Sequence, residues 1–214
     1  AQNIAYYRRG LDELSLNVTN ACPNACVFCI RDRDKGWNVS NLYLERDPTL
    51  KEITDAFDRE SSMLNREGVA LQRVKICGYG EPLMRFSEVI GVVRHIRLKE
   101  PELDIQITTT GWPYFRYVSK DVNGIFNLKF AGLSSLYLSM NAIEEERYMD
   151  LVKPGVNNPN YLAFQDSIRF GIEARDIGLK VTLGFMNIGQ INLLSIKQFA
   201  ERMKMPYKIR EMEE

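Results

Sequence analysis

The chain has 214 residues, 45% of them hydrophobic, which favours one globular domain with a sizeable core. Lysine plus arginine equals aspartate plus glutamate at 28 each, so no overall charge indicates a DNA, RNA or anionic-lipid partner. No apolar run approaches the roughly 18 residues of a transmembrane helix, and the segment Ala1–Arg9 has no signal-peptide core. We therefore expect a cytoplasmic protein whose four cysteines serve metal or redox chemistry rather than disulfides.

Strands and helices are predicted to alternate along the chain. The strands are expected at Leu14–Val18, Arg73–Cys77, Asp104–Thr109, Leu136–Met140, Leu179–Phe185 and Tyr207–Met212. The helices are expected from an N-cap at Asp47 to about Asn65, then at Phe86–Lys99, within Ser119–Phe130, and at Ile143–Leu151, Tyr161–Ile177 and Leu193–Lys204.

Six strands separated by helices predict an α/β fold with parallel strands and right-handed crossovers. Polar and glycine-rich segments follow several of the strands, and in α/β barrels the carboxyl edge of the sheet carries the active site. The chain is therefore expected to form an incomplete barrel with its chemistry at one mouth. A doubly wound open sheet is the rival geometry, because strand order cannot be read from one sequence.

Three cysteines carry the main functional signal. Cys22, Cys26 and Cys29 form a C-x3-C-x2-C loop directly after the first predicted strand. Three thiolates in one short loop can bind three corners of a cubane iron–sulfur cluster and leave the fourth iron open for a non-protein ligand. The alternative is a structural zinc site, which needs a fourth ligand. Cys77 or the single histidine, His95, would have to supply it, and His95 is expected to pack within a helix.

The pattern Cys22-x3-Cys26-x-Phe28-Cys29 after a first strand resembles the signature of the radical S-adenosylmethionine (SAM) superfamily, and the resemblance covers nearly the whole chain. It implies a partial (β/α)6 barrel as a single core domain over residues 1–214, with no auxiliary domain. It also implies that the three cysteines hold a [4Fe–4S] cluster whose open iron is chelated by SAM. Phe28 would pack near the SAM adenine, or is a plain core aromatic.

Further SAM contacts are implied after the later strands. Gly78-Tyr79-Gly80-Glu81-Pro82 is similar to the family's Gly-Gly-Glu-Pro motif, which binds the methionyl amino group, with Tyr79 replacing a glycine. The resemblance assigns Gly78, Gly80 and Glu81 to SAM, whereas the plain alternative is a strand-ending turn. The other implied SAM contacts are Thr108, Thr110, Ser139, Asn141, Lys153 and Gly184. Of these, Asn141 would bind the ribose or cap a turn, Lys153 would pair with the SAM carboxylate or lie in solvent, and Gly184 would admit the adenine.

A finer likeness is to the small TatD-linked radical SAM proteins, carried by residues 42–49, 77–83 and 139–142. It implies association with a TatD-type metal-dependent hydrolase and leaves the substrate unassigned. Glu45 and Arg46 lie outside the general superfamily pattern, and they either contact substrate or form an ion-paired helix entrance. Cys77, the fourth cysteine, cannot build a second cluster alone, and is expected to be a buried strand residue rather than a substrate-side thiol.

The activity implied by the resemblance is reductive cleavage of SAM to a 5′-deoxyadenosyl radical that abstracts hydrogen from a substrate. An external one-electron donor, flavodoxin or ferredoxin, would supply the electron. An uncapped mouth suits a protein substrate, as for glycyl-radical activases, whereas a loop over Trp37–Arg46 would enclose a small metabolite. A nucleic acid is suggested by the TatD association. The competing class is a zinc-binding module without catalysis.

Overall fold

The structure is a computed structural model that describes residues 3–32, 42–118, 124–155, 161–189 and 191–211. Seven strands form one sheet in the order of the sequence, and their bounds are β1 (Ala5–Arg8), β2 (Glu13–Asn17), β3 (Arg73–Cys77), β4 (Asp104–Thr109), β5 (Ser135–Ser139), β6 (Lys180–Asn187) and β7 (Tyr207–Glu211). Strand β1 runs antiparallel to β2, and β2 to β7 are parallel to their neighbours.

The strand order decides between the two predicted geometries. Each crossover from β2 to β7 moves one strand along the sheet in the same direction, as in an α/β barrel, whereas a doubly wound sheet reverses direction partway. Within the described residues β1 and β7 are not paired, so the barrel is open. The predicted partial barrel of parallel strands is therefore confirmed, and β1 is an added edge strand that the sequence analysis missed.

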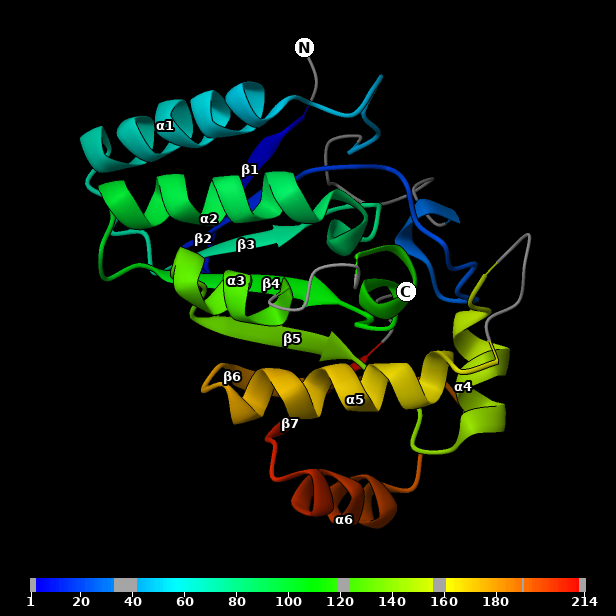
Figure 1. The fold of residues 1–214 in the computed structure, drawn as a ribbon. Coiled ribbons are helices and arrows are strands. Elements are labelled where there is room, and N and C mark those ends of the chain that lie inside the picture. Colours follow the sequence, from blue (N-terminus) through cyan, green and yellow to red (C-terminus); the bar gives the residue numbers. More distant parts are fainter. Residues whose placement is uncertain (1–2, 33–41, 119–123, 156–160, 190, 212–214) are drawn as a thin grey trace.

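The helices connect successive parallel strands along the chain. Their bounds are α1 (Leu50–Arg66), α2 (Phe86–Lys99), α3 (Gly124–Ala131), α4 (Glu145–Val152), α5 (Ala163–Asp176) and α6 (Leu193–Met203), with short helical turns η1 (Ile30–Asp32), η2 (Pro82–Arg85) and η3 (Tyr114–Val118). In Figure 1, α2, α3 and α5 lie in front of the sheet and α6 lies below it. Residues 119–123, where the third helix was predicted to begin, and Met212 lie outside the described residues. None of the described helices is long and apolar enough to cross a membrane.

The start of α1 differs from the prediction. Asp47 was expected to be the N-cap, but Thr49 caps the helix in a capping box with Glu52. The Thr49 side chain accepts from the Glu52 amide, and the Glu52 carboxylate accepts from the Thr49 amide at 2.8 Å. Asp47 is used elsewhere, because its carboxylate accepts a hydrogen bond from the Thr19 hydroxyl at 2.7 Å.

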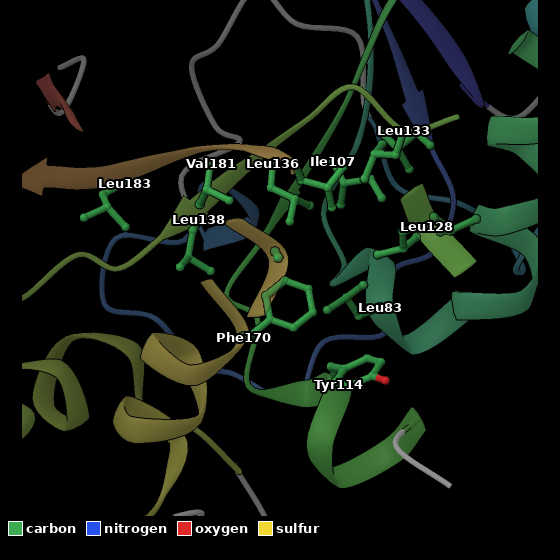
Figure 2. Close-up of a cluster of buried hydrophobic side chains, with 14 of the residues drawn as sticks. Leu83, Ile107, Tyr114, Leu128, Leu133, Leu136, Leu138, Phe170, Val181 and Leu183 are labelled. Carbon is green, nitrogen blue, oxygen red and sulfur yellow. The ribbon is translucent and has the colours of Figure 1, made fainter. Parts of the chain in front are cut away.

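The core lies between the sheet and the helices. Alternate strand residues such as Ile107, Leu136, Leu138 and Leu183 are fully buried and face Phe170 of α5 (Figure 2). The intervening residues lie on the opposite face, called the inner face below, and many are polar. One register row there joins Ser15, Lys75, Gln106 and Ser135 across four strands. The outer face therefore provides the apolar burial, and the inner face is available for chemistry.

Candidate active site

The three cysteines lie in the loop between β2 and η1, at the carboxyl edge of the sheet. Cys22, Cys26 and Cys29 are all partly exposed free thiols, and the Cys29 amide donates to the Cys26 carbonyl at 3.0 Å. Burial raises the pKa of Cys22 to about 11, and the nearby Glu81 carboxylate adds to this shift. Burial and repulsion from the other two thiolates raise the pKa of Cys26 further. A bound metal would reverse this shift, because its positive charge stabilises thiolates and releases the protons.

Backbone hydrogen bonds hold the cysteine loop against the end of α4. The Ala25 amide donates to the Lys153 carbonyl at 3.2 Å, and the Val27 amide donates to the Leu151 carbonyl at 3.0 Å. Lys153 has a left-handed backbone (φ 47°) as the C-cap of α4, and its side chain is exposed. Lys153 therefore holds the cysteine loop through its backbone carbonyl. The pairing of its side chain with the SAM carboxylate stays a prediction.

The donor set does not favour a single metal ion. Among the described residues, no three Cys, His, Asp or Glu side chains lie close enough to bind one ion. The two predicted fourth zinc ligands have other partners, since Cys77 Sγ lies 3.7 Å from the Tyr6 hydroxyl and His95 Nε2 lies 2.8 Å from Asp58 Oδ1. Three thiols in one loop are the number of protein ligands expected for a cubane with one open iron, in which each thiolate binds a different iron.

The glycine turn after β3 packs on the residues that lead into the cysteine loop. Gly78 has φ 140°, and a Cβ there would overlap the Asn17 side chain; a Cβ on Gly80 would overlap the Thr19 carbonyl. The Glu81 amide also donates to the Ala21 carbonyl at 2.9 Å. The glycines thus allow close approach to the Asn17 side chain and the Thr19 backbone, and their predicted contact with SAM stays a prediction.

The Glu81 side chain joins the glycine turn to the end of β4. It is 3% exposed, and its carboxylate accepts four hydrogen bonds: from the Thr109 hydroxyl (2.6 Å), the Leu83 amide (3.2 Å), and the Thr110 amide and hydroxyl (2.9 and 3.0 Å). Burial raises the pKa of Glu81 and these donors lower it, with a net upward shift. A carboxylate has about four acceptor positions, so a SAM ammonium group would reach it only by displacing a protein donor.

A residue that the sequence analysis missed extends this network to the cysteine loop. Asn24 is 3% exposed, its Nδ2 donates to the Thr110 hydroxyl at 3.3 Å, and its Oδ1 accepts from the Trp112 indole at 3.0 Å. In the sequence, its position between Cys22 and Cys26 was the feature that could have predicted a role in the site. Asn24, Thr110 and Glu81 therefore connect the cysteine loop to the ends of β3 and β4.

Two other predicted SAM residues carry buried oxygen atoms without a partner. Asn141 has a left-handed backbone (φ 59°), its amide donates to the Gly184 carbonyl, and its Nδ2 donates to the Ser139 carbonyl at 3.1 Å. Its Oδ1 and the hydroxyl of Thr108 are buried and form no hydrogen bond within the described residues. Asn141 therefore caps its turn, and both residues also offer oxygen atoms that suit a polar ligand such as a ribose.

The space beside Gly184 is filled by a tyrosine. A Cβ on Gly184 would overlap the ring of Tyr137, the neighbouring inner-face residue of β5. The Tyr137 ring therefore occupies the space beside Gly184, and contact of Gly184 with the SAM adenine stays a prediction. Phe28 is half-buried and packs against the edge of the core, and Ser139 is half-buried at the end of β5.

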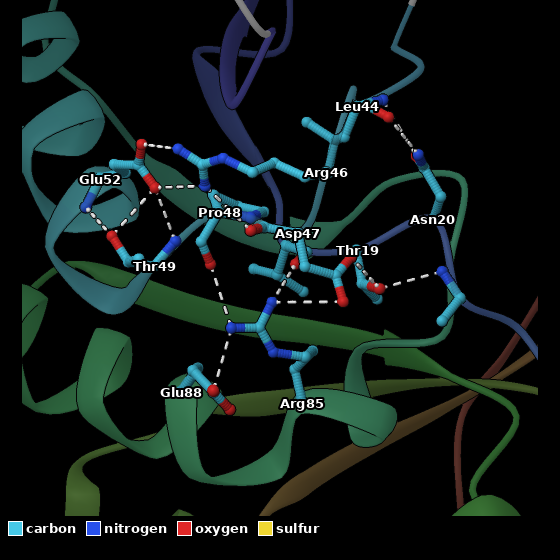
Figure 3. A network of polar contacts seen from close by, with 12 residues as sticks. Thr19, Asn20, Leu44, Arg46, Asp47, Pro48, Thr49, Glu52, Arg85 and Glu88 are labelled. Atoms are coloured by element: carbon cyan, nitrogen blue, oxygen red, sulfur yellow. Dashed lines mark hydrogen bonds and ion pairs between the residues drawn. The ribbon is translucent and has the colours of Figure 1, made fainter.

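Arg46 forms the ion-paired helix entrance that was one of its two predicted roles. Its guanidinium lies 2.5 Å from Oε1 and 2.9 Å from Oε2 of Glu52 (Figure 3). Nearby, Arg85 pairs with Glu88 at 2.9 Å and with Asp47 at 3.5 Å. Glu45 is exposed. Residues 33–41, which include Trp37 at the start of the loop expected to enclose a small metabolite, lie outside the described residues.

Comparison with known proteins identifies the family. The model of the radical SAM superfamily matches residues 16–203. The chain belongs to the radical SAM superfamily. Among curated relatives, it is 24% identical over 198 residues to the GTP 3′,8-cyclase of Nautilia profundicola, covering 91% of this chain and 54% of that protein. It is 28% identical over 149 residues to the GTP 3′,8-cyclase of Limosilactobacillus fermentum, covering 70% and 39%. The chain thus spans about half the length of the relatives it matches, or less.

Solved structures show the same fold. SuiB of Streptococcus suis bound to S-adenosylmethionine has a TM-score of 0.63 at 16% identity, covering 94% of this chain and 39% of that one. Methylornithine synthase (PylB) has a TM-score of 0.56 at 17% identity, covering 94% and 53%. At these identities the likeness supports the partial radical SAM barrel and carries nothing about substrate. The finer TatD-linked likeness is not confirmed by these comparisons.

Proposed function

We propose that this chain is a radical SAM enzyme in which Cys22, Cys26 and Cys29 bind a [4Fe–4S] cluster and SAM binds the iron that no cysteine ligates. When bound, this pair supplies reductive cleavage of SAM to a 5′-deoxyadenosyl radical, which removes hydrogen from an organic substrate. The observation that carries the proposal is three free thiols in one loop, at the carboxyl edge of a parallel sheet, in a member of this superfamily.

The chain's own residues would hold the loop and the ligand in place. Asn24 and Glu81 fasten the cysteine loop and the glycine turn to β4 through fully buried hydrogen bonds. Asn141 and Thr108 present unpaired buried oxygen atoms, which would accept from or donate to ribose hydroxyls. A rigid frame of this kind supports radical chemistry, because the reacting carbon must be held close to its target and away from water.

The partners and the subgroup belong to the same proposal. An external flavodoxin or ferredoxin would deliver the electron, and a reducing cytoplasmic setting would keep the thiols free. Association with a TatD-type hydrolase rests on the sequence likeness of residues 42–49, 77–83 and 139–142. The names of the similar proteins state different activities, from GTP cyclisation to methylornithine synthesis. The substrate class must therefore be inferred from the residues on the inner face of this chain's sheet.

The test is anaerobic purification followed by iron, sulfide and zinc analysis and a SAM-cleavage assay with dithionite. We expect a brown protein with about four irons per chain that releases methionine and 5′-deoxyadenosine. Cys29→Ala should lose both the cluster and the cleavage. Cys77→Ala is the matched control and should keep both, because that thiol lies beside Tyr6 on the sheet. A colourless wild-type protein containing zinc would overturn the proposal in favour of the binding module.

A further inference from the structure

The inner face of the sheet is polar where the interior of an α/β barrel is usually filled by branched apolar side chains. All four residues of the row through Ser15, Lys75, Gln106 and Ser135 are polar or charged. The next row towards the carboxyl edge pairs Thr108 with Tyr137 and Tyr137 with Thr182. This face meets the carboxyl edge of the sheet, where the cysteine loop follows β2, so we take it as the part of the proposed active site that substrate would reach.

Tyr137 is the centre of this face. Gly184 leaves room for its ring, as described above, and the ring is enclosed so that the residue is 7% exposed. Its hydroxyl is buried and forms no hydrogen bond within the described residues, and the same holds for the hydroxyl of Thr108. Buried hydroxyls almost always have partners, so the unpaired hydroxyl of Tyr137 indicates a place for a ligand with hydrogen-bonding oxygen atoms.

Two cations approach the same tyrosine from opposite sides of β5. Lys75 Nζ of β3 lies 5.8 Å from the ring centroid, and the Arg210 guanidinium of β7 lies 5.0 Å from it. The nearest carboxylate to Lys75 is Glu13 at 4.0 Å, and Glu13 is already shared with Arg8 at 3.4 Å. No carboxylate of the described residues lies within ion-pair distance of Arg210.

Among the described residues, the cations around this face therefore outnumber the carboxylates that pair with them. Glu13 also faces Arg73 at 3.9 Å, and Arg73 pairs with Asp104 at 2.7 Å. The carboxylates of Glu13 and Asp104 thus form the ion pairs of three cations, Arg8, Arg73 and Lys75. Arg210 is a fourth cation. Lys75 has 15% of its side chain exposed, and Glu13, its carboxylate partner among the described residues, is shared with Arg8 and Arg73. A partly buried cation gains stability from a further anion.

We propose that the inner face around Tyr137 binds an oxyanion group of the substrate, a carboxylate or a phosphate, between Lys75 and Arg210. The Tyr137 hydroxyl donates to the same group. This deepens the proposed function and rests on it, since it names the substrate class of that active site. The two cations come from strands 135 positions apart in sequence, so the site exists only in the folded sheet.

The test is calorimetric titration of the anaerobically purified holoenzyme with inorganic phosphate, pyrophosphate and succinate at constant ionic strength. Wild type should bind at least one of these anions saturably. Arg210→Gln and Lys75→Gln should each weaken that binding about tenfold or more, the effect of losing one charged hydrogen bond of roughly 1.4 kcal/mol. The matched control is Arg169→Gln, because Arg169 also lies over an aromatic ring, that of Phe115 at 4.3 Å, but on α5.

The outcomes separate this proposal from the radical SAM activity. Tighter phosphate or pyrophosphate binding identifies a phosphorylated substrate, and tighter succinate binding identifies a carboxylate. No saturable binding by wild type, or equal binding by Arg210→Gln and wild type, overturns the oxyanion site. Because Arg210 is exposed, its variant should fold, with an iron content and circular dichroism equal to those of wild type. If the wild-type protein does not cleave SAM, the proposed function is overturned, whereas the titration still reports on the oxyanion site.

Discussion

Replacing Glu81 by glutamine should destabilise the protein, although it exchanges only one carboxylate oxygen for an NH2 group. The carboxylate accepts from four donors, and two of them are backbone amides, those of Leu83 and Thr110. A glutamine has one acceptor oxygen and one NH2 group. Because the Leu83 and Thr110 amides approach different carboxylate oxygens, either orientation of the glutamine amide turns a donor towards a backbone donor.

The magnitude follows from the better of the two orientations. The glutamine oxygen would face Thr110, whose amide and hydroxyl both donate, and the NH2 would face the Thr109 hydroxyl, which can rotate and accept. The Leu83 amide, at 3.2 Å in the wild type, is then left without an acceptor. An unpaired buried donor costs about 1–3 kcal/mol. For a chain of this length, 2 kcal/mol lowers Tm by about 4–8 °C. Glu81→Ala should cost more, since all four donors lose their acceptor.

The assay is thermal unfolding followed by circular dichroism at matched iron content. Glu52→Gln is the control, because its carboxylate also accepts from a backbone amide and a threonine hydroxyl but at the exposed N-terminus of α1. A glutamine preserves a capping box and exposed ion pairs contribute about 0–1 kcal/mol, so Glu52→Gln should lower Tm far less. Equal Tm values for Glu81→Gln and wild type would refute the account of the Glu81 carboxylate as a fully used acceptor.

Three further changes test other parts of the structure. Gly184→Ala places a methyl group where the Tyr137 ring lies and should cost about 1–3 kcal/mol, read from Tm; an unchanged Tm would contradict this packing. Thr49→Ala should cost about 1 kcal/mol of unfolding free energy in urea, because it removes the N-cap of α1. The Arg85 guanidinium lowers the pKa of Glu88 below its ordinary 4.5. Glu88→Gln should therefore reduce stability by under about 1 kcal/mol at neutral pH, and the difference from wild type should vanish as the pH falls below 4.5. A difference that persists in acid would exclude the ion pair as its cause.

Much of the secondary structure was predictable because its determinants are local. The strands at Arg73–Cys77 and Asp104–Thr109 and the helix Phe86–Lys99 have the bounds that alternation, helical periodicity and terminating residues indicated. The N-cap of α1 was placed two residues early, because Asp47-Pro48 satisfies the same local rule as Thr49. The choice between them was made by Thr19 and Arg85, which bind Asp47 from other parts of the fold. Strand β1 was missed since four edge residues carry little periodicity.

The candidate site was predictable in identity and less so in contacts. A glycine that makes room for a ligand cannot be told from the sequence from one that makes room for a neighbouring backbone. Gly80 makes room for the Thr19 carbonyl. Asn24 was overlooked because its partners, Thr110 and Trp112, are more than 80 positions away. A polar residue's partner in a distant segment has no local signature.

The amino-acid sequence by itself determined the chemistry on offer: Cys22, Cys26 and Cys29 in one loop after a strand, followed by an alternation of strands and helices. These depend on residue type and short spacing, which the chain contains before it folds. The tertiary structure alone decided the strand order, the full use of the Glu81 carboxylate, and the approach of Lys75 and Arg210 to one tyrosine ring. The physical reason is that such contacts join residues far apart in sequence, and only the packing of parallel strands with their register brings them together.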